Sequence, residues 1–268
     1  MAFVEKDGLR YYQFESFKGL GVFHAVLTRE GGYSKAPFKS LNFGGTVGDD
    51  PEAVLKNHQK VFRVLNFNFQ SRFDVWQVHG TNIICTDSPR ELNENHQKAD
   101  GILTDNPKVT LFMRFADCVP ILLMDPVKRV IGIVHAGWQG TANKIAQKAI
   151  KALAECYGSN PADVMASVGP SICQECYQVG SEVFEAFRKS FGLEGEKFFS
   201  QNHHHFYLDL WEANRFTLEQ ACVEQIEVAG LCTACHQEDW FSHRGGKGKT
   251  GRFGVLMSLH DPESPGDA

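Results

Sequence analysis

The sequence predicts a mixed α+β fold in which antiparallel hairpins are layered against helices. Two short runs rich in β-branched residues flank a proline-containing turn between residues 120 and 135, as in a β-hairpin. Elsewhere, amphipathic segments with helix start and stop signals lie at irregular intervals. Strands and helices therefore do not alternate regularly enough for a doubly wound parallel sheet. Because no repeat, low-complexity segment or linker divides the chain, we expect one domain over residues 1–268.

Four segments carry helical signals. The first is expected after Asp50-Pro51, because proline is favoured in the first turn of a helix. The second places apolar residues on one face, with Thr141 as its cap and Gly158 as its stop. Free N–H groups near Gly140, at the start of this helix, predict an anion or phosphate site, with an ordinary strand-to-helix turn as the alternative. The four expected helices cover residues 52–65, 143–157, 181–191 and 210–222.

The hairpin places two reactive side chains together. Its strands are expected at residues 121–124 and 130–134, with a turn at 125–128. A four-residue loop that pairs Met124 with Arg129 would set Cys118 directly opposite His135. Opposed residues of an antiparallel pair have Cα atoms roughly 4.5–5.5 Å apart and point to the same face. A thiol and an imidazole so placed can share a metal ion or act as nucleophile and base.

A third residue strengthens the interpretation as a metal site. His79 ends an apolar run just before Gly80, so we expect it at the end of a strand. One Cys and two His are ligand types that Zn²⁺ prefers, and they leave a fourth position open for water or substrate. The sequence therefore predicts a catalytic metal site at His79, Cys118 and His135. Zinc is the first expectation, and copper (Cu²⁺) is the alternative because thiolate and imidazole also suit it.

Composition excludes several classes of function. A hydrophobic content of 43% and a charged content of 22% are ordinary for a globular protein. A net charge of −5 argues against a general nucleic-acid or membrane surface. No apolar run approaches the roughly 20 residues of a membrane span, and the N-terminus lacks a signal-peptide pattern. The expected location is the cytoplasm.

The eight cysteines are too few for a disulfide scaffold in a chain of this length. Four of them form two C-x₂-C pairs, as in a four-cysteine zinc ribbon, but the gap between the pairs is far longer than the usual ~15–20 residues. A structural zinc and reduced free thiols both remain open for Cys173, Cys176, Cys232 and Cys235. The internal run of three histidines at 203–205 is expected to be a polar loop beside a strand.

A set of ordered motifs resembles the YfiH-like family, also called the laccase-domain or multicopper polyphenol oxidoreductase family. The motifs, which together span almost the whole chain, are the N-terminal block at 27–58, QVHG (77–80), ADG (99–101), ADCVP (116–120), HAGWQGT (135–141), GPSI (169–172) and TGR (250–252). The resemblance implies a complex α+β layered sandwich of mixed, largely antiparallel sheets with helices. It also implies a metal-binding His-Cys-His triad, carried onto His79, Cys118 and His135.

The family has more recently been described as purine nucleoside phosphorylase with adenosine deaminase activity. The resemblance thus implies a zinc enzyme that converts adenosine, inosine and methylthioadenosine to free base plus ribose 1-phosphate or methylthioribose 1-phosphate. Its partners would be a small-molecule purine nucleoside and phosphate, with no nucleic acid or membrane, in a monomer or homodimer. Two alternatives stay open: a Cys/His amide hydrolase that edits peptidoglycan precursors, and a copper-dependent polyphenol oxidase (laccase).

Arginines and loop residues are the candidates for substrate or phosphate binding, because phosphorolysis needs an anion pocket. Asp117 is the carboxylate nearest to Cys118 in sequence, and the HxE motif of zinc deaminases is absent. Two departures from the family pattern bear on this pocket: Gln139 replaces the usual Arg or Lys, and His243 replaces a Tyr. The complete set of such candidates is Arg29, Asn42, Gln77, Asp117, Gly140, Arg244 and Arg252.

Overall fold

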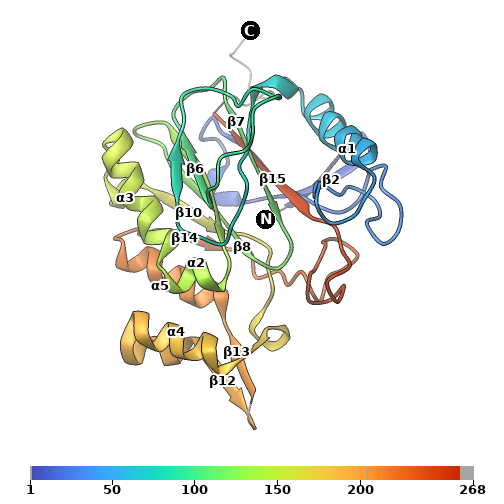
Figure 1. Cartoon of the computed structure of the whole chain (residues 1–268). Helices are drawn as coiled ribbons and strands as arrows, with labels where there is room; N and C mark the ends of the chain where they lie inside the picture. Colours follow the sequence, from blue (N-terminus) through green and yellow to red (C-terminus); the bar gives the residue numbers. More distant parts are fainter. Residues whose placement is uncertain (1, 204, 260–268) are drawn as a thin grey trace.

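Two six-stranded sheets pack face to face in the computed structural model, which describes residues 2–203 and 205–259 (Figure 1). The strands of the first sheet, in spatial order, are β1 (Ala2–Lys6), β2 (Leu9–Gln13), β3 (Phe23–Leu27), β15 (Phe253–Ser258), β7 (Thr110–Phe115) and β4 (Arg72–Phe73). Those of the second are β14 (Gln225–Val228), β10 (Met165–Val168), β8 (Val119–Asp125), β9 (Val130–Ala136), β6 (Gly101–Thr104) and β5 (Ile83–Cys85).

Helices cover the outer faces of both sheets. Helix α1 lies on the opposite side of the molecule from α3 and α5 (Figure 1). The helices are α1 (Pro51–Val64), α2 (Trp138–Ala142), α3 (Ile145–Tyr157), α4 (Ser181–Phe191) and α5 (Leu210–Gln220). Most strand pairs are antiparallel, and the parallel pairs are β4–β7, β5–β6 and β10–β14. The prediction of an α+β layered sandwich with mixed, largely antiparallel sheets is therefore confirmed.

Strands β8 and β9 are buried on both faces. Alternate residues such as Leu122 and Ile133 point into the core between the two sheets, whereas Ile121 and Val134 point toward α3. A strand covered on both sides reads as a continuous apolar run instead of an alternating one. The hairpin that carries Cys118 and His135 is thus held by two cores at once.

The pairing of β8 with β9 differs from the predicted register by two residues. Asp125 pairs with Val130, so Pro120, not Cys118, lies opposite His135. The side chain of Asp125 accepts the N–H groups of the second and third residues after it at 2.8 and 2.9 Å, which makes Asp125 the last residue of β8 and places the turn at 126–129. A displacement of two residues keeps every side chain on its predicted face.

One expected helix has the predicted bounds, α4, and the other three need correction. Helix α1 covers residues 51–64 instead of 52–65, and it begins after Asp50, whose side chain accepts the N–H of Glu52 at 3.0 Å. Helix α5 ends at residue 220 instead of 222. The segment expected to be one helix at 143–157 is instead the short α2 and the longer α3, separated by a left-handed residue, Lys144, with φ +58°. Thr141 therefore lies inside α2 and caps neither helix.

A small third sheet extends from the sandwich beneath α4 (Figure 1). It contains β11 (Gln178–Val179), β13 (His205–Leu208) and β12 (Phe199–Asn202). His203 lies in the turn between β12 and β13, as expected for a polar loop, but His205 is the first residue of β13, and His204 is outside the described residues. A disulfide that the sequence did not predict joins Cys85 of β5 to Cys156 of α3.

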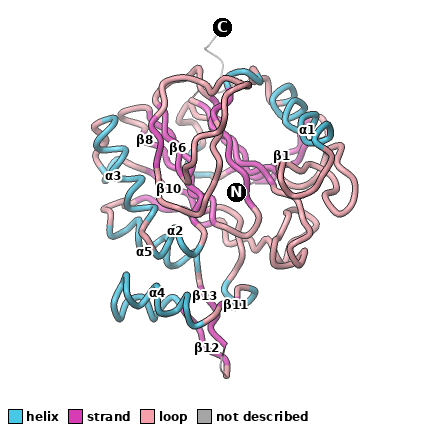
Figure 2. The backbone as a smooth tube through the Cα atoms, in the orientation of Figure 1, coloured by secondary structure: helices cyan, strands magenta, loops and turns pink. Residues whose placement is uncertain are grey.

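Long loops run over one end of the sandwich (Figure 2). Two of them, residues 28–50 and 236–252, lie side by side. The N–H of Arg29 donates to the carbonyl of Asp239 at 2.7 Å, and that of Phe43 donates to Arg252 at 2.9 Å. Among the residues that the structure describes, no helix is long and apolar enough to cross a bilayer.

Candidate active site

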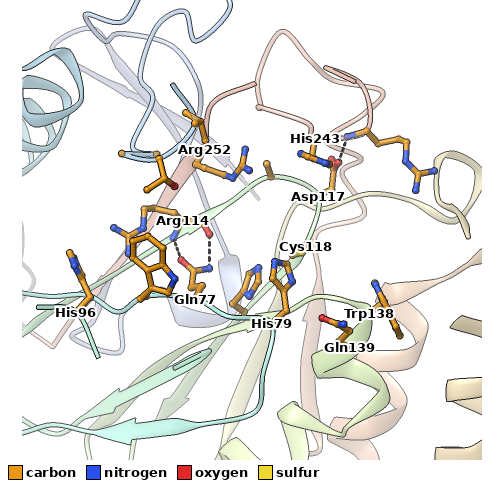
Figure 3. A pocket seen from close by; sticks show the side chains of 18 of the residues that line it. Gln77, His79, His96, Arg114, Asp117, Cys118, Trp138, Gln139, His243 and Arg252 are labelled. Carbon is orange, nitrogen blue, oxygen red and sulfur yellow. Dashed lines mark hydrogen bonds between the residues drawn. The ribbon is translucent and has the colours of Figure 1, made fainter. Parts of the chain in front are cut away.

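His79, Cys118 and His135 meet at one point (Figure 3). One ligand atom from each, a ring nitrogen or Sγ, lies within 4.8 Å of the other two. His135 is on β9, and Cys118 immediately precedes β8. His79 was predicted at the end of a strand, but it lies in an irregular segment between β4 and β5. The three predicted ligands are therefore together, although the predicted register and strand end were wrong.

Asp100 positions two of these three residues. Its fully buried carboxylate lies 2.9 Å from Nδ1 of His135 and accepts the N–H groups of three consecutive residues, Val78, His79 and Gly80, at 3.2, 3.0 and 2.7 Å. The chain wraps around this carboxylate, and His79 takes a left-handed φ of +58°. Because Nδ1 of His135 is engaged, Nε2 is the nitrogen left to face Cys118.

Charge in the site favours a thiolate next to an imidazolium. Burial opposes ionisation of Cys118, but the charge and hydrogen bonds of His135 and His79 outweigh it and lower the pKa of the thiol to about 6. Burial likewise opposes protonation of His135, but Cys118 and Asp100 raise its pKa to about 9. Burial would also raise the pKa of Asp100, yet the hydrogen bond from His135 and the backbone N–H groups lower it.

The site fits a metal ion in its donors and in its space. Cys and His are zinc ligands, and the contact of Asp100 with His135 is the carboxylate support that metal-binding histidines typically have. Gly137 faces the triad, and a Cβ there would lie 2.9 Å from Nδ1 of His79 and 3.0 Å from Sγ of Cys118. A side chain at residue 137 would therefore fill the space between two ligands, and glycine keeps it open.

The triad lies in a cavity of about 700 Å³, within the usual size range of small-molecule sites. Cationic and aromatic side chains share its wall. The arginines are Arg114, Arg244 and Arg252, and the large aromatic residues are Trp76, Trp138 and Tyr177. Figure 3 shows Arg114 and Arg252 on one side of the triad, with Trp138 and Gln139 on the other. The cavity therefore offers both charge for an anion and flat surfaces for a base.

Four of the seven candidate substrate residues line this cavity: Gln77, Asp117, Arg244 and Arg252. All four make hydrogen bonds within the protein: the guanidinium of Arg244 donates to the carbonyl of Cys176 at 3.4 Å, and that of Arg252 donates to the carbonyls of Thr250 and Gly251 at 3.3 and 2.9 Å. Gln77 pairs through its amide with the backbone of Arg114, at 2.7 and 3.0 Å. Asp117, with φ +80°, accepts the hydroxyl of Thr233 at 2.7 Å and the N–H of Arg244 at 2.6 Å. These contacts hold neighbouring parts of the wall in place.

The other three candidates do not line the cavity. The guanidinium of Arg29 donates to the carbonyls of Lys39 and Gln237 and thereby ties two loops together. Asn42 is fully buried, and its side chain accepts the N–H of Arg252 at 2.8 Å. Gly140 lies inside α2, which has only five residues, and not at the start of a longer helix. Arg29 and Asn42 can thus act on the pocket only through the loops that they hold.

Sequence reasoning missed Asp100, Arg114, Trp76 and Tyr177. Asp100 lies within the quoted ADG motif, next to the start of β6, so a carboxylate at a strand end was a usable signal. Arg114 follows the apolar run at 111–113 in β7, where a cation needs a partner, and its guanidinium lies 3.2 Å from the carboxylate of buried Asp74. Trp76 is 48% exposed at the cavity edge, and no local pattern marks it or Tyr177.

Comparison with known proteins agrees with this architecture. The family model described as multi-copper polyphenol oxidoreductase laccase matches residues 23–260. Purine nucleoside phosphorylase YlmD of Bacillus subtilis (strain 168) is 38% identical over 243 residues, covering 87% of each chain. Purine nucleoside phosphorylase YfiH of Escherichia coli (strain K12) is 31% identical over 242 residues, covering 89% of this chain and 94% of that protein.

Solved structures share the fold. The crystal structure of the Bacillus licheniformis hypothetical protein YfiH matches with a TM-score of 0.89 and 35% identity, covering 96% of this chain and 98% of that one. That of YlmD from Geobacillus stearothermophilus has the same TM-score and coverage at 32% identity. The layered sandwich described above is thus the fold of these proteins.

Proposed function

Because the chain belongs to the YfiH-like family, whose model is described as multi-copper polyphenol oxidoreductase laccase, we propose that it is a zinc-dependent purine nucleoside phosphorylase. Its substrates would be adenosine, inosine and methylthioadenosine, with deamination of adenosine as a side activity. The observation that carries the proposal is the open three-ligand site of His79, Cys118 and His135 in a pocket lined by arginines and aromatic side chains.

The protein holds the three metal-binding side chains in position. Asp100 holds His135 through Nδ1 and fixes the loop of His79, so both rings face Cys118 before any ligand arrives. The lowered pKa of Cys118 keeps its sulfur as a thiolate near neutral pH, the form that binds metals. When bound, zinc would supply an open coordination position and a Lewis acid acting on substrate or water.

The arginines supply the anion site for phosphate. Arg252 and Arg244 approach the cavity from the loop at 243–252, and Arg114 comes from β7 and donates to the carbonyl of Val75, the residue before Trp76. Guanidinium groups bind phosphate oxygens with paired, charge-assisted hydrogen bonds. The neutral Gln139 stands across the triad in Figure 3, so we place phosphate nearer to Arg252 than to α2.

Phosphorolysis then needs phosphate beside the sugar. A phosphate oxygen forms a bond to C1′ while the bond from C1′ to the purine nitrogen breaks, and the electron pair leaves with the base. The base takes up one proton, which gives free purine and sugar 1-phosphate. The indole of Trp76, which is 48% exposed at the cavity edge, can stack on the purine, since every base offers a flat surface to an aromatic ring. The arginine charge binds the phosphate and holds it beside C1′, while the negative charge that develops in this step lies on the departing base and is neutralised by the proton that the base takes up.

Chromatography of adenosine reaction products, with and without inorganic phosphate, tests this proposal. We expect adenine and ribose 1-phosphate only when phosphate is present, because phosphate is the attacking group. Inosine should still form slowly without phosphate, since deamination requires only water. If neither product forms under either condition, the proposed function is wrong.

One observation favours a second candidate, a Cys/His amide hydrolase acting on peptidoglycan precursors. Cys118, His135 and Asp100 form a chain of nucleophile, base and orienting carboxylate. This enzyme would need no metal, so cleavage of an amide substrate would survive complete chelation. Activity that vanishes on chelation and returns with added zinc would exclude it.

Copper is the alternative cofactor, because two His and one Cys also form copper sites and the family description names copper. Within residues 2–203 and 205–259, however, only two groups of His, Cys or acidic residues could hold a metal, whereas multicopper oxidases need about four coppers. We therefore favour zinc, and metal analysis of purified protein distinguishes the two ions.

We also propose a cytoplasmic monomer or homodimer, which fractionation and light scattering would test.

A further inference from the structure

A second group of sulfur atoms lies outside the residues that line the cavity. The Sγ atoms of Cys173, Cys176, Cys232 and Cys235 all lie within 4.8 Å of one another, and we call these four residues the cysteine cluster. None of them is in a disulfide. The two C-x₂-C pairs are 59 residues apart in sequence, so the fold, not local chain geometry, brings them together.

The spacing of the sulfurs fits a tetrahedral ion. Four sulfurs each ~2.3 Å from one zinc at the corners of a tetrahedron are about 3.8 Å apart. The Sγ atoms of Cys176 and Cys235 are 3.5 Å apart, and all four lie within 4.8 Å. Sulfurs of a disulfide would be separated by only ~2.05 Å. The cluster therefore has the dimensions of a four-thiolate metal site.

The backbone aligns the two pairs. Ser171 donates its N–H to the carbonyl of Leu231 and accepts that of Thr233, both at 3.1 Å, so the chain just before the first pair runs beside the start of the second pair. The first pair closes a tight turn, in which the N–H of Cys176 donates to the carbonyl of Cys173 at 3.2 Å, and at the second pair the N–H of His236 donates to the carbonyl of Cys232 at 3.0 Å. The N–H of Cys173 also donates to Sγ of Cys232 at 3.3 Å, a contact that stabilises negative charge on sulfur.

We propose that the cysteine cluster binds a structural zinc ion, separate from the catalytic metal. Four thiolates fill all four positions of Zn²⁺, which leaves no place for substrate and is the arrangement of structural sites. The ion joins two loops that otherwise share only short backbone contacts. Metal binding of this kind contributes directly to folding free energy.

The same two loops support one wall of the catalytic pocket. Tyr177, next to Cys176, lines the cavity, and the guanidinium of Arg244 lies 3.4 Å from the carbonyl of Cys176. Thr233, next to Cys232, donates to the carboxylate of Asp117, the neighbour of Cys118. The cluster zinc thus braces the wall that carries Tyr177, Arg244 and Asp117 without touching the substrate.

Metal counting on the full chain tests the proposal. Zinc is measured by mass spectrometry in wild type and in C176S/C235S, which loses two sulfurs at partly or fully exposed positions. We expect one zinc fewer per chain in the double variant, and no change in the matched control C222S, an exposed cysteine outside the cluster. Equal zinc in wild type and C176S/C235S overturns the proposal.

Cobalt binding gives a second measurement that does not depend on the double variant folding. Metal-free C118A retains the cluster but lacks the thiolate of the catalytic site, so added Co²⁺ should give strong sulfur-to-metal absorption with one equivalent bound. Chelation should also lower the melting temperature of C118A. If C118A shows no such absorption, or if freshly purified wild type contains disulfides among these four cysteines and no bound metal there, the proposal is wrong.

Discussion

The two sulfur-containing sites of this molecule differ in ligand number and in access. The proposed catalytic site has one Cys and two His in the lining of a cavity, whereas the cysteine cluster has four thiols and lies outside that lining. A three-ligand site leaves room for chemistry, and a four-ligand site leaves none. The number of cysteines therefore does not identify an active site. An open coordination position on the metal does.

The two sites are also built differently. Cys118 and His135 sit at the ends of strands that are buried on both faces, and buried Asp100 adds a rigid support. The cysteine cluster rests on two loops joined by a few backbone hydrogen bonds. We therefore expect loss of the catalytic metal to cost activity and little stability, and loss of the cluster metal to cost stability first.

The largest expected effect is on activity in Cys118→Ala. Losing a ligand should cost at least about 1,000-fold in kcat/KM, more than the ~10–100-fold expected for a residue that only supports a ligand. The melting temperature should change little, because the surrounding core is intact. Adenosine turnover and circular dichroism measure the two quantities. Full activity in Cys118→Ala would mean that the three-ligand site is not catalytic, so the two sites would no longer differ in function.

Asp100→Asn should have the next largest effect. The amide has one acceptor where the carboxylate has two, yet the carboxylate serves His135 and three backbone N–H groups. We expect zinc affinity at the catalytic site and kcat/KM to fall about 10–100-fold. Competition with a chromophoric chelator measures the affinity. Unchanged affinity would mean that Asp100 does not position the ligands.

Arg252→Gln should weaken phosphate binding specifically. Removing a charged hydrogen bond costs about 1.5–3 kcal/mol, so the KM for phosphate should rise roughly 10–100-fold. Phosphate-independent deamination should change far less, because it needs no anion. Initial rates at varied phosphate and fixed adenosine measure the effect. Equal losses of activity in phosphorolysis and deamination would mean that Arg252 supports the structure of the site and does not bind phosphate.

A fourth prediction concerns the stability of the protein core alone and is independent of both metal sites. Burial lowers the pKa of His24 to about 3, whereas the unfolded chain takes up the proton near the ordinary value of 6.5. Stability from this residue is therefore complete above pH 6.5 and falls as pH drops toward 3, by at most about 1.4 kcal/mol per pH unit.

Urea unfolding of chelated protein at several pH values tests this effect. His24→Gln keeps an acceptor for the N–H of Phe14, which now donates to His24 at 2.7 Å, and should reduce the slope of stability against pH between 6 and 4. An unchanged slope would assign the acid sensitivity to other groups. The chelator ensures that the slope reports the core and not metal release.

Much of the fold class and of the catalytic site could be predicted from local signals. The Asp50-Pro51 helix start and the glycine-bounded helices follow from backbone chemistry. The hairpin register was wrong because Asp125, through its turn hydrogen bonds, ends β8 one residue later than the proline suggested. His79 was placed on a strand because an apolar run does not reveal that its backbone wraps around Asp100.

What sequence could not supply was the pairing of distant loops. The two C-x₂-C pairs were visible, but their meeting depends on the backbone contacts between residues 171 and 231–233. Arg114 and Tyr177 reach the cavity through the packing of separate elements, so no local spacing identifies them. Gly140 was expected at a helix start, and only the break at Lys144 shows that α2 is a separate short helix.

Anomalous diffraction at the zinc absorption edge, on crystals of the purified full chain, tests the central comparison most directly. We predict one peak ~2.0–2.3 Å from a ring nitrogen of His79, Sγ of Cys118 and a ring nitrogen of His135, with a free coordination position toward the cavity. A second peak should lie among the four sulfurs of the cysteine cluster. A map with no peak among His79, Cys118 and His135 would contradict the account.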